Sequence, residues 1–312
     1  MKVLITGGLG HIGSHLIRNI DPKVITDLVV VDNLLTQRYS SIFGLKPEHK
    51  VKFIEEDVNS HNLAKIIEDA DVVIHLAAIT NAEKSSENLE EIEETNIKGL
   101  EAIANLCSRF GTKLIFPSTT SVYGKQNGMV DENCSGEELQ PQSAYAESKI
   151  RGEKLLEKIS LPSNLQFAIL RVGTIFGYSQ GMRFHTAVNK FIWEANLGLP
   201  ISVWTTAIDQ LRPYCGLNDF NAAIHHLLKE DLFKSDIFNI VTLNTTVREV
   251  IKVIENQVGK VTINYVDSQI MNQLSYEVSN EKSLSYGFRY NDSLEEEIKK
   301  TLSHLNGIRN AR

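Results

Sequence analysis

Short, nearly unbroken runs of Val, Ile and Leu recur through the first half of the chain, with helix-like segments between them. Such runs are typical of strands buried on both faces of a parallel sheet, because a half-exposed strand would alternate apolar and polar positions. We expect strands at 3–5, 28–31, 51–54, 72–75, 114–116 and 167–170, and helices at 11–20, 61–69, 88–109 and 143–160. This alternation predicts an α/β fold with a doubly wound parallel sheet and helices on both of its faces.

The rhythm changes after about residue 176, where helices and shorter strands follow one another less regularly. We expect a helix in 181–198, a strand in 199–204, a helix in 217–230, a strand in 236–241, a helix in 246–259 and a terminal helix from 293. Thr246 is a candidate N-cap, and Ser293 with Glu296 forms a capping-box pattern. We therefore predict a first domain at 1–175 and a smaller mixed α/β domain at 176–312, interleaved with the first near 213–241.

Composition restricts the partners of the chain. Its 312 residues are 42% apolar and 23% charged, with a net charge of -7. No Lys/Arg run stands out, so we predict neither a nucleic-acid nor a membrane partner, although a local Arg cluster could still bind a small anionic substrate. No apolar run approaches the length of a membrane span, and the N-terminus lacks a signal-peptide pattern.

The cysteines indicate the compartment. Cys107, Cys134 and Cys215 are far apart and form no CxxC pair, so neither a disulfide framework nor a zinc site is indicated, and we predict no metal. A reducing compartment fits best, and we expect the protein to be cytoplasmic.

A glycine turn follows the first predicted strand directly. Gly7, Gly10 and Gly13 are evenly spaced in "ITGGLGHIGSHL", and "LVVVDN" ends in Asp32, nineteen residues after Gly13. A dinucleotide site needs glycines for a tight turn and close packing, and an acid at the second strand binds the adenosine ribose and repels a 2′-phosphate. We therefore favour NAD over NADP and over the alternative of a flexible turn with a solvated acid. Among nearby residues, His11 is more simply a packing residue than a metal ligand.

The stretch "SAYAESK" at 143–149 carries the candidate chemistry. Tyr145 and Lys149 are four residues apart and share one face of the predicted helix. A fixed ammonium beside a phenol would lower the pKa of the phenol and make it a general base near neutral pH. Hydroxyls at 118–121 follow the fifth strand and could orient a substrate alcohol. The heptapeptide by itself favours the simpler interpretation, an ordinary amphipathic helix with one aromatic residue and one cation.

Together these segments resemble the extended short-chain dehydrogenase/reductases, in particular the NAD-dependent nucleotide-sugar epimerases and dehydratases of the UDP-glucose 4-epimerase type. The match covers nearly the whole chain and includes "TGGLGHIGSHL", "VVVDNL", "EEDV", "HLAA", "NIKG", "STTSVYG", "LGLPISVW", "LRPYCGLND" and "SNEKSLSYGFRY". The resemblance implies a Rossmann domain that binds NAD, a domain that binds a nucleotide-diphospho-sugar, and a homodimer or homotetramer built on the helices at 88–109 and 143–160.

The resemblance also implies roles for single residues. The catalytic residues would be Tyr145, Lys149 and Thr119. The residues that hold NAD would be Gly7, Gly10, His11, Ile12, Gly13, Asp32, Asn33, Asp57, Val58, Leu76, Ala77, Ala78, Asn96, Tyr145 and Lys149. The residues that hold the substrate would be Thr119, Thr120, Thr174, Arg183 and Arg212, although Arg183 is equally compatible with a solvated cation at a helix start.

The resemblance implies oxidation of a sugar at C4, most simply by a 4-epimerase. A C4 dehydrogenase and a 4-keto reductase are alternatives, because all three would use the same residues. A 4,6-dehydratase is disfavoured, since Thr120 and Ser121 occupy the positions where that chemistry needs Asp and Glu. Thr174 replaces the usual Asn, and Pro213 and Gly216 replace the usual Asp and His, which suggests an unusual sugar such as a GDP- or CDP-linked hexose or heptose. An NAD-sensing scaffold is the non-enzymatic alternative.

Overall fold

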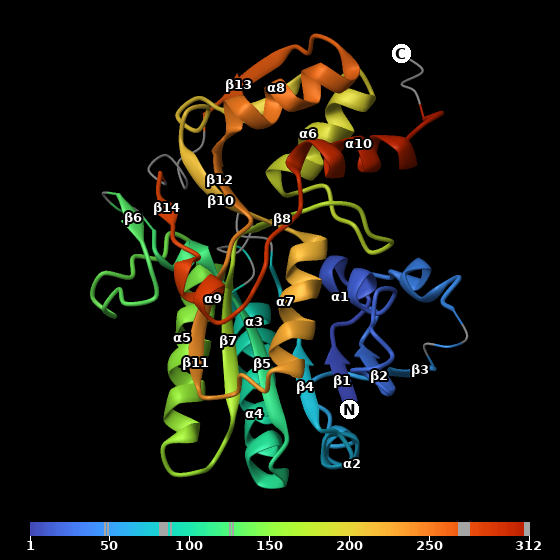
Figure 1. The fold of residues 1–312 in the computed structure, drawn as a ribbon, viewed down its shortest axis with the longest axis vertical. Helices are drawn as coiled ribbons and strands as arrows, with labels where there is room; N and C mark the ends of the chain where they lie inside the picture. Colours follow the sequence, from blue (N-terminus) through green and yellow to red (C-terminus); the bar gives the residue numbers. More distant parts are fainter. Residues whose placement is uncertain are drawn as a thin grey trace.

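The fold of the protein is seen in a computed structural model that describes residues 1–46, 48, 50–80, 87, 89–124, 126, 128–267 and 275–308 (Figure 1). Its largest element is a seven-stranded sheet with the strand order β11-β7-β5-β4-β1-β2-β3, in which every pairing is parallel. The strands are β1 (Lys2–Thr6), β2 (Asp27–Asp32), β3 (Val51–Glu55), β4 (Val72–His75), β5 (Lys113–Thr119), β7 (Phe167–Val172) and β11 (Asp236–Ile240). The predicted Rossmann sheet and its strands are confirmed.

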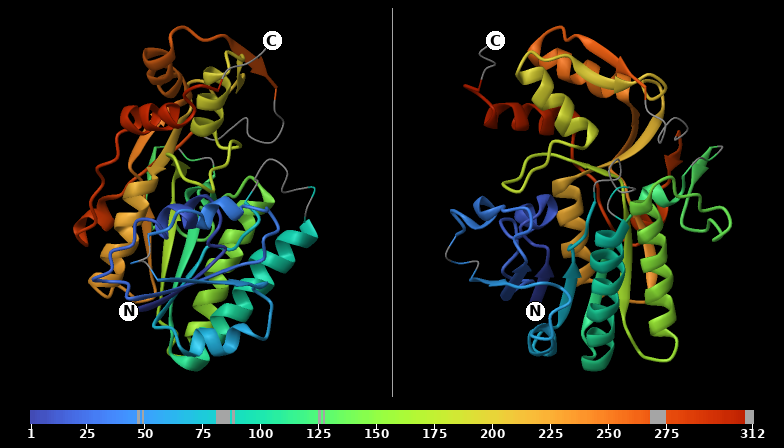
Figure 2. Two further views of the ribbon diagram at one scale, coloured as in Figure 1. Left: turned by 90° about the vertical axis from the view of Figure 1, so that its right-hand side faces the viewer. Right: turned by 180° about the vertical axis from the view of Figure 1, so that it is seen from behind.

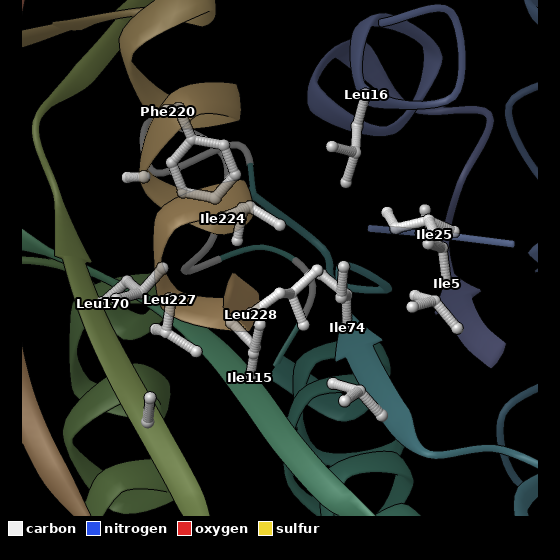
Figure 3. Packing of buried hydrophobic residues seen from close by; sticks show 14 of the residues in the cluster. Ile5, Leu16, Ile25, Ile74, Ile115, Leu170, Phe220, Ile224, Leu227 and Leu228 are labelled. Atoms are coloured by element: carbon white, nitrogen blue, oxygen red, sulfur yellow. The ribbon is translucent and has the colours of Figure 1, made fainter. Parts of the chain in front are cut away.

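Helices cover both faces of this sheet, as Figure 2 shows from the side and from behind. One face packs against α1 (His11–Leu16) and α7 (Leu217–Lys229), and the other against α2 (Leu63–Glu68), α4 (Gly99–Phe110) and α5 (Ala144–Ser160). In Figure 3, Phe220, Ile224 and Leu227 of α7 pack with strand residues such as Ile115 and Leu170. The sheet is therefore buried on both faces, which explains its unbroken apolar strands.

A second, smaller layer of structure lies above the carboxyl end of the sheet in Figure 1. It has its own apolar cluster, which draws on all three of its helices. The helices are α6 (Ala187–Asn196), α8 (Val247–Val258) and α10 (Leu294–His304). The strands are β8 (Thr174–Phe176), β10 (Leu211–Gly216) and β12 (Leu243–Thr246), which form one sheet, and β9 (Ile201–Trp204) with β13 (Ile263–Val266), which form another. A last pair joins β6 (Met129–Val130) to β14 (Glu277–Val278).

The chain passes between the two layers more than once. After β10 it enters α7, which packs on the large sheet, and then β11, which pairs with β7 at the edge of that sheet. Phe288, beyond α9 (Glu281–Ser285), also packs with the first layer. The domain limits proposed from the sequence stay a prediction.

Three predicted helices differ in their bounds. The helix expected at 11–20 ends at Leu16, because the side chain of Asn19 donates to the His15 carbonyl and that of Arg18 to the Ser14 carbonyl. The helix expected in 181–198 begins only at Ala187, because the preceding segment is held against the first layer. The helix expected at 88–109 consists of α3 (Leu89–Ile92), a π-helical segment at 93–98 and α4. None of the described helices is long and apolar enough to cross a bilayer.

The predicted N-caps of the later helices are confirmed. The backbone N–H of Glu249 donates to the hydroxyl of Thr246, and that of Glu296 donates to the hydroxyl of Ser293. Because all strands of the large sheet are parallel, the ends of β1, β2, β4, β5 and β7 lie at one edge. Ligands of such sheets bind at this edge, and most of the predicted site residues follow these strand ends.

Candidate active site

The glycine turn is packed so closely that side chains are excluded. Gly7 has a φ of +65°, and a Cβ there would lie 2.5 Å from the backbone of Ala77. A Cβ on Gly13 would lie 2.4 Å from the carbonyl oxygen of Gly8, whereas Gly10 has slightly more room, at 3.3 Å from the Gly7 oxygen. The turn therefore presents bare backbone at the edge of the sheet, as a dinucleotide pyrophosphate requires. Ile12 follows it in α1.

The residues predicted at the adenosine end form one hydrogen-bonded group at the ends of β2 and β3. The carboxylate of Asp32 accepts from the backbone N–H groups of Leu9 (3.0 Å) and Leu34 (2.9 Å). The amide of Asn33 donates to the carboxylate of Asp57 at 2.8 Å. The neighbouring Val58 is different, because its side chain packs against α4 and only its backbone is left to meet a cofactor.

His11 is a buried neutral imidazole at the glycine turn. Burial, and then the charge of Arg183, lower its pKa to about 3. Its Nδ1 lies 3.3 Å from the hydroxyl of Ser179, and its buried Nε2 has no hydrogen-bond partner in the part of the chain that the structure describes. A buried polar atom without a partner is costly to the protein, and a phosphate oxygen at the turn would satisfy it. This atom and the crowded glycines fit the NAD that the sequence predicts.

The loop after β4 is tied to the catalytic helix through Asn96. The Asn96 side chain accepts from the backbone N–H of Ile79 (2.8 Å) and donates to the Ile79 carbonyl (3.0 Å) and to the Ser148 hydroxyl (3.0 Å). Ser148 in turn donates to the carbonyl of Tyr145 at 2.7 Å. Because its amide is engaged with the protein on both sides, Asn96 would act on a cofactor through the predicted contacts Leu76, Ala77 and Ala78 rather than directly.

Tyr145 and Lys149 lie on one face of α5, as their spacing predicts. The helix starts at a Ser143 N-cap, whose hydroxyl accepts from the N–H of Ala146 at 3.2 Å. Tyr145 is half-buried, and its hydroxyl has no hydrogen-bond partner within the described part of the chain. Lys149 is 5% exposed, and its Nζ donates to the Pro117 carbonyl at 2.8 Å and lies 5.9 Å from the centre of the Tyr145 ring.

The expected lowering of the tyrosine pKa by the lysine is wrong for this structure. Burial raises the pKa of Tyr145 to about 12, and the cation that opposes this rise is Arg183. Burial also lowers the pKa of Lys149 to about 8, against the charge of Glu153. Desolvation outweighs the attraction between neighbours here, because both groups sit in a low-dielectric environment and the ammonium is directed at a backbone carbonyl.

Thr119 is the last residue of β5, and a hydrogen bond from the backbone orients its hydroxyl. The oxygen accepts from the N–H of Ser121 at 3.2 Å and caps the 3₁₀ turn at 120–122, which leaves the hydroxyl proton to be donated elsewhere. Thr120 is buried, and its hydroxyl donates to the carbonyl of Val172 at 3.3 Å. Of these two predicted substrate contacts, Thr119 therefore has the freer donor.

The remaining predicted substrate residues lie in two places. Arg183 is half-buried, burial lowers its pKa to about 10, and its charge acts on both His11 and Tyr145, so it lies between the glycine turn and the tyrosine. The guanidinium of Arg212 donates to the side chain of Gln210 at 2.9 Å. Thr174 lies beside Tyr214 in the ladder of β8 and β10.

Two residues of the site were missed from the sequence. Tyr276 is 4% exposed, and its phenol lies near the hydroxyls of Thr120 and Ser121 and near Arg212. No motif surrounds it. Glu153 is buried one helical turn beyond Lys149, and its position did carry a signal, because residues four apart share a helix face.

Comparison with known proteins identifies a family whose model matches most of the chain. The model of the NAD dependent epimerase/dehydratase family matches residues 3–240. A Bacillus subtilis protein described as an uncharacterized UDP-glucose epimerase is 29% identical over 278 residues, which cover 86% of this chain and 85% of that protein. The chain thus matches most of this curated relative.

Solved structures show the same fold. UDP-glucuronic acid 4-epimerase from Bacillus cereus, in complex with UDP-glucuronic acid and NAD, is 24% identical with a TM-score of 0.87, over 98% of this chain and 100% of that one. DesIV, a dTDP-glucose 4,6-dehydratase from Streptomyces venezuelae with NAD bound, is 22% identical with a TM-score of 0.88, over 98% and 97%. At these identities the structures establish the fold alone.

Proposed function

This chain belongs to the NAD dependent epimerase/dehydratase family, and from that premise we propose that it is a nucleotide-sugar 4-epimerase that acts through Tyr145, Lys149 and Thr119. NAD is the cofactor of the family. The observation that carries the proposal is the Tyr145 hydroxyl, which has no hydrogen-bond partner among the described residues. Tyr145 shares a helix face with a buried lysine and lies at the sheet edge where Thr119 ends its strand. The Bacillus subtilis relative, described as a UDP-glucose epimerase, supports the same reaction class.

Each of the three side chains has a distinct task in this proposal. Tyr145 takes the proton of the sugar hydroxyl at C4, and Thr119 donates its free hydroxyl proton to the same oxygen and orients it. Lys149 supplies positive charge beside the phenolate, and its ammonium N–H groups can donate to the ribose hydroxyls of the cofactor. Bound NAD supplies the hydride acceptor, and a 4-epimerase returns the hydride to the other face of the sugar.

The substrate would be a nucleotide-diphospho-sugar. Arg183 and Arg212 supply cations from the second layer, and guanidinium groups suit phosphate oxygens because they can form paired hydrogen bonds. The guanidinium of Arg183 forms no hydrogen bond or ion pair with other residues in the described ranges, which supports a role in binding an anion. The base and the sugar are left open, and the departures at Thr174, Pro213 and Gly216 favour an uncommon sugar.

The dehydratase alternative has less support. It needs a carboxylic acid and base beside the catalytic threonine, whereas Thr120 and Ser121 offer only hydroxyls there, and the Thr120 hydroxyl donates to the Val172 carbonyl. A C4 dehydrogenase or a 4-keto reductase would use the same three residues as the epimerase. These two reactions are the second candidates.

The test is to incubate the purified protein and NAD with a panel of UDP-, dTDP-, GDP- and CDP-sugars. Absorbance would follow NADH, and NMR would identify the products. We expect a C4 epimer without net NADH. Stoichiometric NADH or a released keto sugar would instead indicate a dehydrogenase. A Tyr145→Phe protein run in parallel shows whether a contaminating enzyme causes the conversion. If the protein binds NAD but converts no sugar, the scaffold alternative is favoured.

A further inference from the structure

A buried acid continues the helix face that carries Tyr145 and Lys149. Glu153 follows Lys149 by one helical turn, and its side chain is 5% exposed. One carboxylate oxygen accepts from the hydroxyl of Ser118 at 2.5 Å. Arg171 of β7 donates to both oxygens, from Nε at 3.2 Å and from Nη2 at 2.7 Å. From the sequence, Ser118 was expected only as one of the hydroxyls at 118–121, and Glu153 and Arg171 had no predicted role.

Among the described residues, Glu153 is the anion whose charge acts on Lys149, one turn away on the same helix. Lys149 is buried, and burial alone would drive it toward the neutral amine. The groups that face it are Tyr145 on its own helix, the Phe116 ring of β5 at 4.5 Å, His75 of β4 and Glu153. Burial keeps His75 neutral, with its pKa lowered to about 3, so the carboxylate is the negative charge in this set.

The same acid also fixes the end of β5. The Pro117 carbonyl accepts from Lys149, and the next residue, Ser118, donates to Glu153. Two consecutive residues of the strand are thus held by two consecutive turns of α5. Thr119 follows immediately, so its distance from Tyr145 depends on these two hydrogen bonds.

Arg171 compensates the buried charge and is itself held in place. Its Nη1 donates to the hydroxyl of Tyr123 at 3.1 Å, and Tyr123 donates to Asn239 of β11 at 2.8 Å. The carboxylate therefore keeps an opposite charge and hydrogen bonds on each oxygen, which a buried ion needs to be tolerated. In other proteins, replacing a buried ion pair by an apolar pair of similar volume is often neutral or stabilising, so a buried ion pair is weak evidence for a purely structural role.

We propose that Glu153 is a positioning residue for the reaction, which keeps Lys149 charged and holds Ser118, and through it Thr119, against the catalytic helix. The proposal rests on the proposed function for the tasks of Lys149 and Thr119. Its central element, a lysine that stays charged because of Glu153, also bears on NAD binding, which can be measured without any sugar.

The experiment measures NAD affinity by calorimetry between pH 6 and 9.5 for the wild type and for Glu153→Gln. In the wild type, affinity falls as the pH rises through the pKa of Lys149, because the neutral amine binds the ribose hydroxyls less strongly. Glu153→Gln keeps the shape but removes the negative charge. We expect the midpoint of this fall to move to lower pH by about one unit, which is the effect of one nearby charge.

Ser118→Ala is the matched control. It removes the strand contact and leaves the carboxylate, so we expect the NAD midpoint to stay at the wild-type pH while kcat falls about three- to tenfold with little change in KM, as for a misplaced orienting group. If the protein turns over no sugar, calorimetry still tests whether Glu153 keeps Lys149 charged. Failure of the proposed function is therefore distinguishable from failure of this inference.

A second variant covers the case in which Glu153→Gln does not fold, since it leaves Arg171 unpaired. Glu153→Gln/Arg171→Met removes both charges, and we expect a smaller midpoint shift in the same direction. An unchanged midpoint in either folded variant overturns the proposal, as does a shift in Ser118→Ala equal to that in Glu153→Gln. Failure of both Glu153 variants to fold would mean that the pair only maintains the fold, which also overturns it.

Discussion

The glycine turn and the junction of β5 with α5 lie at the same sheet edge but use their polar groups differently. Beside the turn, the side chains predicted to hold the adenosine are fixed by hydrogen bonds: the Asp32 carboxylate accepts from the N–H groups of Leu9 and Leu34, and the Asn33 amide donates to Asp57. At the junction, the hydroxyl of Tyr145 has no partner within the described ranges, and the Thr119 proton is free to be donated. The glycine turn and its neighbours therefore form a binding site of fixed shape, whereas the junction of β5 with α5 presents hydroxyl groups that can bond to a substrate.

The pKa values of the ionisable groups near the junction add a second difference between the two regions. Burial raises the pKa of Tyr145 to about 12 and lowers those of Lys149 to about 8 and of Arg183 to about 10. Each shift destabilises the charged form that the proposed reaction needs, so a bound anion or cofactor would restore what burial removes. Changes at the turn should therefore alter cofactor affinity, and changes at Tyr145 should alter turnover.

The largest effect is expected at the junction. Tyr145→Phe removes the proposed base without altering packing, so turnover should fall by roughly 10²–10⁴-fold. Steady-state kinetics on the sugar identified by the panel would measure it, with NAD affinity and the melting temperature as controls. Turnover within a few-fold of the wild type would show that another group takes the proton.

The next largest effect is expected at the glycine turn, where a substitution should weaken NAD binding. Gly13→Ala places a Cβ 2.4 Å from the Gly8 oxygen, so the turn must open, and NAD affinity should fall at least about tenfold, or about 1.4 kcal/mol. Gly136→Ala is the matched control, because that exposed glycine has nothing within 4 Å of an added Cβ. Calorimetry would compare the two. Equal NAD affinities would mean that the turn does not contact the cofactor.

A smaller effect links the two regions through Arg183. Its positive charge opposes the rise in the pKa of Tyr145, so Arg183→Gln should raise that pKa further. Because the proposed base acts deprotonated, the acid limb of the pH–rate profile should move to higher pH, with about three- to tenfold lower turnover below it. Arg183→Lys, which keeps the charge, should leave the limb close to its wild-type position. If the acid limb does not move in Arg183→Gln, the charge of Arg183 does not influence the pKa of Tyr145.

The smallest effect concerns cofactor choice. Asp32→Asn keeps an acceptor for a backbone N–H but removes the charge that would repel a 2′-phosphate. The preference for NAD over NADP should fall by about tenfold or less, measured as the ratio of the two dissociation constants. An unchanged ratio would assign the discrimination to another residue.

The parts of this site that follow from local sequence were predictable. The strands, the glycine turn and the pairing of Tyr145 with Lys149 depend on periodicity and on spacing within one element, and the structure has each of them. The direction of the tyrosine pKa was not predictable, because it depends on burial by distant segments. Arg183 reaches the glycine turn because Gly181 donates its N–H to Ser14, a contact across 167 residues that no local pattern signals.

Tyr276 illustrates a second limit. It follows no motif, and it joins the site because β14 pairs with β6 beside the 3₁₀ turn that ends β5. The helix expected in 181–198 was too long for a related reason, since the residues before Ala187 are apolar enough for a helix but are held by long-range hydrogen bonds. Both cases arise where the second layer meets the first.

The return of the chain to the large sheet has a consequence for its synthesis. Helix α7 and strand β11 are made only after the ribosome has passed through β8, α6 and β10. Until then, one face of the nascent sheet lacks the cover of Phe220, Ile224 and Leu227 (Figure 3). The edge of β7 that later pairs with β11 is also open. Such surfaces invite aggregation, so the nucleotide-binding half should not be obtainable as a soluble fragment ending near residue 175, and the growing polypeptide should depend on chaperone protection until residue 240 has emerged.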